Sequence, residues 1–193
     1  MAKLAKGFGG KKRAIIILFI LIISMMILSQ MNCFWRLIYP LEYKNIIISN
    51  AEEFDIDPAL VAAMIFVESK YVSSAQSHRG AKGLMQIMPD TGHWIAEQLS
   101  ISDFKEDKLL DPMINIMFGC WYIDSLMQQF NKELIVVLAA YNAGRGNVKR
   151  WLDNNNWDGR NATIDDLPFD ETKNYIKQVL AVYKIYKKIY RFE

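Results

Sequence analysis

The chain has 193 residues, a formal net charge of +2 and a hydrophobic fraction of 52%. This length suffices for one domain, and the apolar excess predicts an additional membrane segment. Removing the five basic residues of the N-terminal tail leaves the remainder near −3, which excludes the basic surface of a typical nucleic-acid-binding protein. The two cysteines form no disulfide framework, and His78 and His93 are too isolated for a metal site. We therefore expect neither a metal nor a cofactor.

The N-terminal region predicts a membrane anchor. Residues 14–35 contain no charge over 22 positions, which is long enough for a hydrocarbon core of roughly 30 Å at about 1.5 Å per residue. The positive-inside rule then predicts a basic cytoplasmic tail over 1–13, a transmembrane helix over 14–35 and an exported domain over 36–193. A cleaved signal peptide is the alternative, although residues 29–35 contain no small-x-small cleavage site.

Apolar periodicity predicts helices through most of the exported domain. Asp57-Pro58 and Asp111-Pro112 each supply an N-cap followed by a proline at the first helical position. The helices are expected over 42–54, 58–68, 112–130, 133–141 and 172–190. No stretch alternates at period two, so we expect a mainly α domain with little or no sheet. The Ser-, Asn-, Asp- and Gly-rich segments 71–82 and 153–168 are the expected long loops.

Glu68 is the first candidate for chemistry, because it closes the almost wholly apolar run 58–67. Glutamate is almost never fully buried without a partner. Desolvation and the negative end of a helix both raise the pKa of a carboxyl group. This position indicates a proton donor that works near neutral pH. The alternative is that the helix ends at Lys70 and that Glu68 is solvated or paired with a lysine.

Sequence blocks downstream of Glu68 carry a family resemblance. They are Ser77, Gly80-Ala-Lys-Gly-Leu-Met-Gln-Ile-Met-Pro89, Ala139-Ala-Tyr-Asn-Ala-Gly144 and the segment 167–175 with Glu171-Thr172 and Tyr175. In this order and spacing they resemble the soluble lytic transglycosylase family, whose lysozyme-like domain cleaves bacterial peptidoglycan. The resemblance runs from about Tyr43 to Tyr186. It implies a mainly α, lysozyme-like catalytic domain, here preceded by the single predicted transmembrane helix.

The resemblance implies that Glu68 acts as acid and then as base in cleaving the β-1,4 bond between N-acetylmuramic acid and N-acetylglucosamine. In this family the 6-hydroxyl of the muramic acid attacks its own anomeric carbon and gives a 1,6-anhydromuramic end without consuming water. The absence of a second acid beside Ser77, Gln86 or Tyr141 agrees with this, since most glycosidases use two carboxylates. Two alternatives stay open: a hydrolytic muramidase, and a non-catalytic glycan-binding scaffold of a wall-spanning apparatus.

Five residues are the expected substrate-binding set. The amide of Gln86 and the ring and hydroxyl of Tyr141 suit a sugar, although Gln86 could bond backbone and Tyr141 could be a core residue. Ser77 could equally stabilise a turn, and Met88 could fill a gap in the core. Glu171 matches an acidic position of the family, and its position at the start of the last helix would also explain it.

The expected partners are peptidoglycan glycan strands and, through the N-terminal helix, the membrane, with no nucleic acid. The expected location is a bacterial cell membrane, with the catalytic domain on the extracytoplasmic side. His78 and Arg79 stand where the family usually has smaller residues. Contacts to the peptide stem are therefore not carried over from the family.

Overall fold

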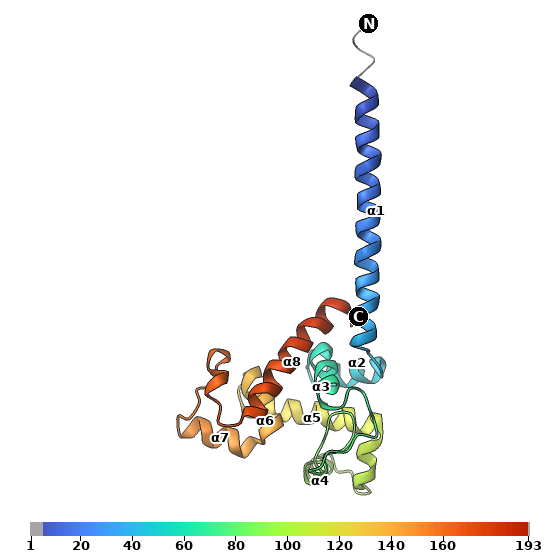
Figure 1. Ribbon diagram of the computed structural model, residues 1–193. Helices are drawn as coiled ribbons and strands as arrows, with labels where there is room; N and C mark the ends of the chain where they lie inside the picture. The colour runs from blue at the N-terminus through green and yellow to red at the C-terminus, as the bar shows by residue number, and fades with distance from the viewer. Residues whose placement is uncertain (1–5, 193) are drawn as a thin grey trace. The chain divides into compact units, whose positions relative to one another are not determined.

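The computed structural model describes residues 6–192, without the side chains of residues 6–9, 11 and 26–33. It consists of two compact units, Met1–Pro40 and Leu41–Glu193. The first unit contains one continuous helix, α1 (Lys6–Ile38), drawn in blue in Figure 1. Residues 1–5 of the predicted tail over 1–13 lie outside the described residues.

The predicted transmembrane helix over 14–35 is not supported. Among the helices in the described part of the chain, none combines the length and the apolar character that crossing a membrane requires. The side chains of 26–33 lie outside the described residues.

The named elements of the second unit are all helices, which confirms the mainly α prediction. Its elements are α2 (Lys44–Glu53), α3 (Pro58–Ser69), α4 (Pro89–Gln98), η1 (Glu106–Leu110), α5 (Pro112–Gln129), α6 (Leu134–Ala143), α7 (Arg145–Asp153), η2 (Asn161–Asp166) and α8 (Asp170–Ile189). The described residues form no named strand. Two isolated antiparallel bridges join Lys82 to Gln76 and to Ile87.

Helix α3 is the central element, and its sequence explains both of its ends. The carboxylate of Asp57 accepts a hydrogen bond from the Ala59 amide at 2.9 Å and so caps the N-terminus. Every residue from 59 to 65 is buried, as expected for a helix that is apolar on all faces. The helix ends where Lys70 adopts the left-handed conformation with φ 53°. Glu68 therefore lies in its last turn.

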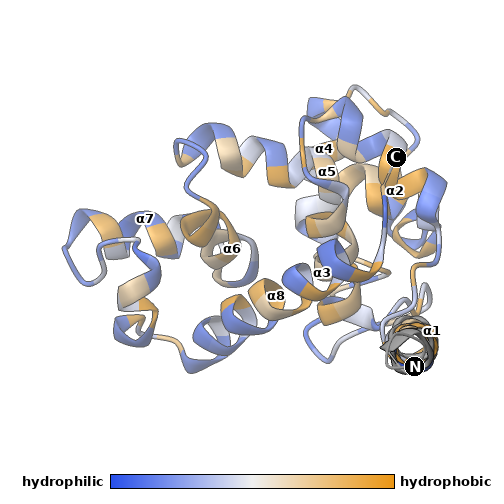
Figure 2. Ribbon diagram, turned by 90° about the horizontal axis from the view of Figure 1, so that it is seen from above, coloured by the Kyte–Doolittle hydropathy of each residue, from blue (hydrophilic) through white to orange (hydrophobic). Residues whose placement is uncertain are grey.

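Helix α8 packs along α3. Figure 2 shows hydrophobic and hydrophilic residues alternating along α8, and its buried side includes Thr172, Tyr175 and Tyr186. The hydroxyl of Tyr183 also donates to Asp57 Oδ2 at 2.5 Å, so the cap of α3 is tied to α8. Two long helices thus form a fixed frame around Glu68.

The buried side chain of Asn115 holds the segment 82–85 against α5. Its amide nitrogen donates to the Leu109 carbonyl at 2.7 Å and to the Lys82 carbonyl at 3.0 Å, and its oxygen accepts from the Met85 amide at 2.7 Å. Gly83, with φ +79°, leaves no room for a side chain, since a Cβ there would lie 2.1 Å from the Leu109 carbonyl oxygen. The segment that carries Gln86 is therefore anchored by backbone contacts.

Candidate active site

One pocket collects all six residues that the sequence analysis selected. It has a volume of about 390 Å³. It is lined by Glu68, Ser77, His78, Arg79, Ala81, Gln86, Met88, Tyr141, Asn142 and Glu171. These residues come from the end of α3, the segment between α3 and α4, the end of α6 and the start of α8. The blocks that are separate in sequence are therefore neighbours in space.

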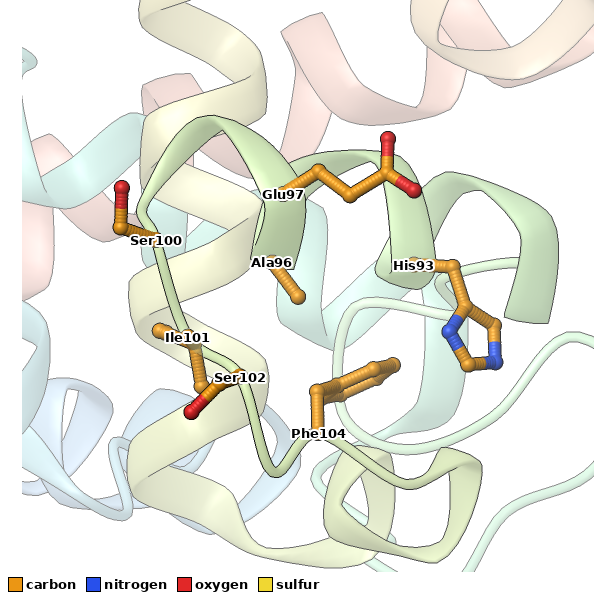
Figure 3. Close-up of a pocket in the computed structure, with 7 residues that line it drawn as sticks. All are labelled: His93, Ala96, Glu97, Ser100, Ile101, Ser102 and Phe104. Atoms are coloured by element: carbon orange, nitrogen blue, oxygen red, sulfur yellow. The ribbon is translucent and has the colours of Figure 1, made fainter.

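A second pocket, of about 360 Å³, lies over α4 and the loop that follows it. Figure 3 shows its lining, including the rings of His93 and Phe104 side by side. These rings pack edge to face with centroids 5.1 Å apart, and His93 Nε2 is 4.0 Å from Glu106 Oε1. No cluster of acids, histidines and cysteines able to hold a metal occurs among the described residues. We assign the functional site to the other pocket, because Glu68 and the other five residues selected from the sequence line that one and not this one.

Glu68 contributes a titratable carboxyl group to this pocket. Burial raises the pKa of its carboxyl group from 4.5 to about 7. The hydroxyl of Tyr175 opposes this rise, and the negative charge of Glu171 adds to it. At neutral pH the protonated and ionised forms of Glu68 are therefore both well populated. This balance suits a group that must first give up a proton and then recover one.

Tyr175 is a site residue to which the sequence analysis gave no role. Its hydroxyl is buried and makes no hydrogen bond of standard geometry among the described residues. It is nevertheless near enough to act on Glu68 as a donor, which lowers the pKa of that carboxyl. Burial raises the pKa of Tyr175 well above its ordinary value, so the hydroxyl keeps its proton. The spacing of four residues from Glu171 was the available signal, because it places both on one face of a helix.

Tyr141 lies deep in the pocket, and its hydroxyl already has a partner. It donates to the Met85 carbonyl at 2.9 Å, and its ring packs against Tyr122 with centroids 5.4 Å apart. Its single donor is thus used for the backbone, and its expected role toward the substrate stays a prediction. The oxygen can still accept a hydrogen bond.

Gln86 combines the predicted pocket position with the backbone-bonding alternative. Its backbone is left-handed with φ 48°. Its amide nitrogen donates to the Ala75 carbonyl at 3.2 Å and to the Gly83 carbonyl at 2.9 Å. Both amide hydrogens are therefore used inside the protein. The amide oxygen is the group that remains for a ligand, as an acceptor only.

Ser77 and Met88 both lie in the segment between α3 and α4 and line the pocket. The hydroxyl of Ser77 accepts from the Ala81 amide at 3.0 Å, which fixes the turn and leaves the hydroxyl proton for another partner. Met88 precedes α4 with 40% of its surface exposed. It therefore offers an apolar contact in the pocket rather than filling a gap in the core.

Asn142 is a second pocket residue to which the sequence analysis gave no role. Its side-chain oxygen accepts a hydrogen bond from the hydroxyl of the buried Thr172 at 2.7 Å. This bond joins the end of α6 to the first turn of α8, which carries Glu171. The sequence block named Asn142, but only the packing of α6 against α8 shows this connection.

Residues 45–164 match the sequence profile of the transglycosylase SLT domain. The chain belongs to this family. The match ends before Glu171 and Tyr175, so the position of these two residues in the site rests on the structure.

Several relatives support this membership. The soluble lytic murein transglycosylase of Salmonella typhimurium is 37% identical over 153 residues, which cover 77% of this chain and 23% of the relative. The solved structure of the 70 kDa soluble lytic transglycosylase of Escherichia coli is 34% identical with a TM-score of 0.74, over 80% of this chain and 25% of that one. The solved structure of the lytic transglycosylase Slt of Pseudomonas aeruginosa is 32% identical with a TM-score of 0.71. The match covers 78% of this chain and 24% of that one. The chain thus spans about a quarter of the length of these relatives.

Proposed function

We propose that this chain is a peptidoglycan lytic transglycosylase that cleaves the β-1,4 bond between N-acetylmuramic acid and N-acetylglucosamine. The observation that carries the proposal is the carboxyl group of Glu68, with a pKa of about 7, inside a pocket built from the blocks of the SLT family. The names of the relatives, murein transglycosylases, support the same substrate. Since murein lies outside the cytoplasmic membrane, the activity would require the domain to reach that side.

The chemistry of the proposal needs one titrating group. Protonated Glu68 gives its proton to the glycosidic oxygen as the bond from that oxygen to the anomeric carbon breaks, which releases the N-acetylglucosamine 4-hydroxyl. The Glu68 carboxylate then removes the proton of the muramic 6-hydroxyl as that oxygen bonds to the anomeric carbon. The product is a 1,6-anhydromuramic end, and Glu68 is protonated again. Because the attacking hydroxyl belongs to the same sugar, the step has the advantage of an intramolecular reaction.

The remaining side chains have supporting roles in this proposal. Tyr175 donates to the ionised form of Glu68 and so favours release of its proton. The Gln86 amide oxygen accepts an N–H or O–H of the sugar, and Met88 contacts an apolar sugar face. The hydroxyl of Ser77 accepts a hydrogen bond within its turn and can donate its own proton to the sugar. Each role follows from the donors and acceptors that the protein leaves free in the pocket.

A hydrolytic muramidase is the second candidate, and Glu171 is the observation that favours it. Most glycosidases use two carboxylates, and Glu171 lines the same pocket as Glu68. The central sequence blocks contain no second acid beside Ser77, Gln86 or Tyr141, but the fold brings one from α8. In a muramidase, one carboxylate would serve as base for water, or as nucleophile. The scaffold alternative, by contrast, requires binding without cleavage.

Product analysis tests these candidates. Purified peptidoglycan is digested with the native chain, and the fragments are separated by mass spectrometry. A transglycosylase yields anhydromuramic ends, whereas a muramidase yields reducing ends heavier by one water per cut. Reducing ends as the main product would overturn the proposal in favour of hydrolysis. No cleavage by a folded, glycan-binding chain would favour the scaffold.

A further inference from the structure

Arg79 is a charged pocket residue that the proposed reaction does not use. It stands near the tip of a turn in which the Ser77 amide donates to the Ala81 carbonyl at 2.9 Å and the Gly80 amide donates to the Ser77 carbonyl at 2.9 Å. Gly80, with φ +89°, has open space where a side chain would be. The backbone below Arg79 is therefore fixed, while its side chain is 80% exposed.

Within the described part of the chain, the guanidinium of Arg79 pairs with Glu171 Oε2 at 3.4 Å and with no other acid. Both side chains are largely exposed, at 80% and 64%, and exposed ion pairs are stabilised weakly, by about 0–1 kcal/mol. Arginine offers five N–H donors in a planar fork that matches a carboxylate in two-point geometry. The single contact to Glu171 leaves most of these donors unused and is easily exchanged for another carboxylate.

The charges of the pocket make this cation distinctive. Among the described residues that line it, Arg79 alone carries a permanent positive charge, whereas Glu68 and Glu171 are acids. Lys82, the next cation along the loop, is held by Glu106 and Asp107 at 3.3 Å each and does not line the pocket. An anionic group entering the pocket therefore finds its permanent cation in Arg79, with His78 beside it in the lining.

We propose that Arg79 binds a carboxylate carried by the muramic acid residue of the substrate and that Glu171 occupies this position when no substrate is present. This inference rests on the proposed function, since it concerns the substrate of the same pocket. The carboxylate has two possible sources: a carboxyl group of the peptide attached to muramic acid, or the lactyl carboxyl group itself where the peptide has been removed. N-acetylglucosamine carries no carboxylate, so Arg79 distinguishes the two kinds of sugar.

The test measures binding by calorimetry with the full chain carrying Glu68→Gln, which prevents turnover. Three ligands are compared: peptide-bearing murein fragments, peptide-free murein fragments with free lactyl carboxylates, and neutral N-acetylglucosamine oligomers. We expect the additional change Arg79→Gln to weaken binding of one or both murein ligands about 10-fold, the effect of losing roughly one charged hydrogen bond. Binding of the neutral oligomers should be unchanged. The murein ligand that is affected identifies the source of the carboxylate.

Two further variants sharpen the test. Arg79→Lys keeps the charge without the fork and should show an intermediate loss. Arg160→Gln is the matched control, since Arg160 is an exposed arginine paired with Asp158 at 3.6 Å and lies outside the pocket lining. The loss at Arg79 should also shrink as salt is raised, because an exposed charge is screened.

An equal loss for the neutral oligomers, an unchanged affinity for both murein ligands, or no binding of any ligand would each overturn the inference. Digestion of peptidoglycan by the native chain is measured in parallel. If the native chain produces anhydromuramic ends while Arg79→Gln leaves murein binding intact, the inference about Arg79 fails and the proposed function stands. If the native chain cleaves nothing, the digestion experiment contradicts the proposed function, independently of the binding results.

Discussion

Glu171 acts on Glu68 across one pocket, although the two acids belong to different helices. Burial is the main reason that the pKa of Glu68 rises to about 7, and the negative charge of Glu171 adds to the rise. Tyr175, four residues after Glu171 on α8, works in the opposite direction by favouring the charged form of Glu68. The first turns of α8 therefore adjust the acidity of a group on α3 in both directions.

Glu171→Gln should lower the pKa of Glu68, because it removes a like charge. The first step of the proposed reaction needs protonated Glu68, so activity should fall as pH rises through this pKa. We expect that alkaline limb to move to lower pH in the variant. Initial rates of peptidoglycan cleavage between pH 4 and pH 9 provide the measurement. An alkaline limb that moves upward would contradict the influence of Glu171.

Tyr175→Phe should have the opposite effect on the pH profile. The phenylalanine cannot donate to the carboxylate, so the pKa of Glu68 should rise further and the alkaline limb should move to higher pH. We also expect the rate at the optimum to fall roughly 10-fold, at the low end of the range for lost proton-transfer assistance. Tyr183→Phe is the matched control, since its hydroxyl bonds Asp57 and not Glu68. The Tyr183→Phe variant should be less stable than the native chain, but the alkaline limb of its pH profile should stay at the same pH.

Glu68→Gln should fold like the native chain and lose nearly all cleavage. The amide keeps the shape of the side chain but has no proton to transfer, and loss of a general acid typically costs on the order of 100-fold to 10,000-fold. Circular dichroism establishes the fold, and release of soluble fragments from peptidoglycan gives the activity. A variant that keeps more than about a tenth of native activity would reject Glu68 as the acid.

The helices with a local start signal were predicted well from the sequence. Asp57 and Asp111 both cap their helices through their carboxylates, and the observed Pro112–Gln129 agrees closely with the expected 112–130. Helices α4 and α7 were not predicted. Each contains few apolar residues and an internal glycine, so their stability depends on packing against other elements, which a local pattern does not show.

The candidate site was predicted in its membership but not in its hydrogen bonding. The sequence blocks selected residues that line one pocket, because residue type and order are visible in a sequence. The direction of the Gln86 amide depends on a left-handed backbone, and the partner of Tyr141 is a carbonyl 56 positions earlier in the chain. Such details depend on the tertiary structure. For the same reason Tyr175, brought to Glu68 by the packing of α8 on α3, received no role.

Asn115→Ala should destabilise the domain by about 2–4 kcal/mol, because it leaves the Met85 amide and the Leu109 carbonyl without their buried partner. The Lys82 carbonyl also loses a bond but keeps the one from the Ile87 amide. Urea unfolding followed by circular dichroism measures the change. Gln128→Ala is the control, since its amide makes an exposed bond to Asp124 and its loss should cost little. An Asn115 variant as stable as the control would show that the segment 82–85 is held by packing instead.

The raised pKa of Glu68 also predicts how stability depends on pH. The folded-state pKa of about 7 lies above the unfolded value near 4.5, so the folded chain binds more protons between these values. The stabilising contribution of Glu68 is therefore complete below about pH 4.5 and is lost as pH rises through about 7. Relative to the always-neutral Glu68→Gln, the native chain should lose up to about 3 kcal/mol by pH 8, at about 1.36 kcal/mol per pKa unit.

Thermal melts of the two proteins from pH 4 to pH 8 measure this difference. The variant should match the native chain near pH 4 and become the more stable of the two at neutral and alkaline pH, although it is inactive throughout. Arg160→Gln, which changes an exposed charge outside the pocket, should follow the native curve. A Glu68→Gln variant that is clearly less stable than the native chain at pH 8 would mean that Glu68 is a paired structural charge. The site would then lack its proton donor, because a carboxyl group stabilised in its ionised form has a lowered pKa.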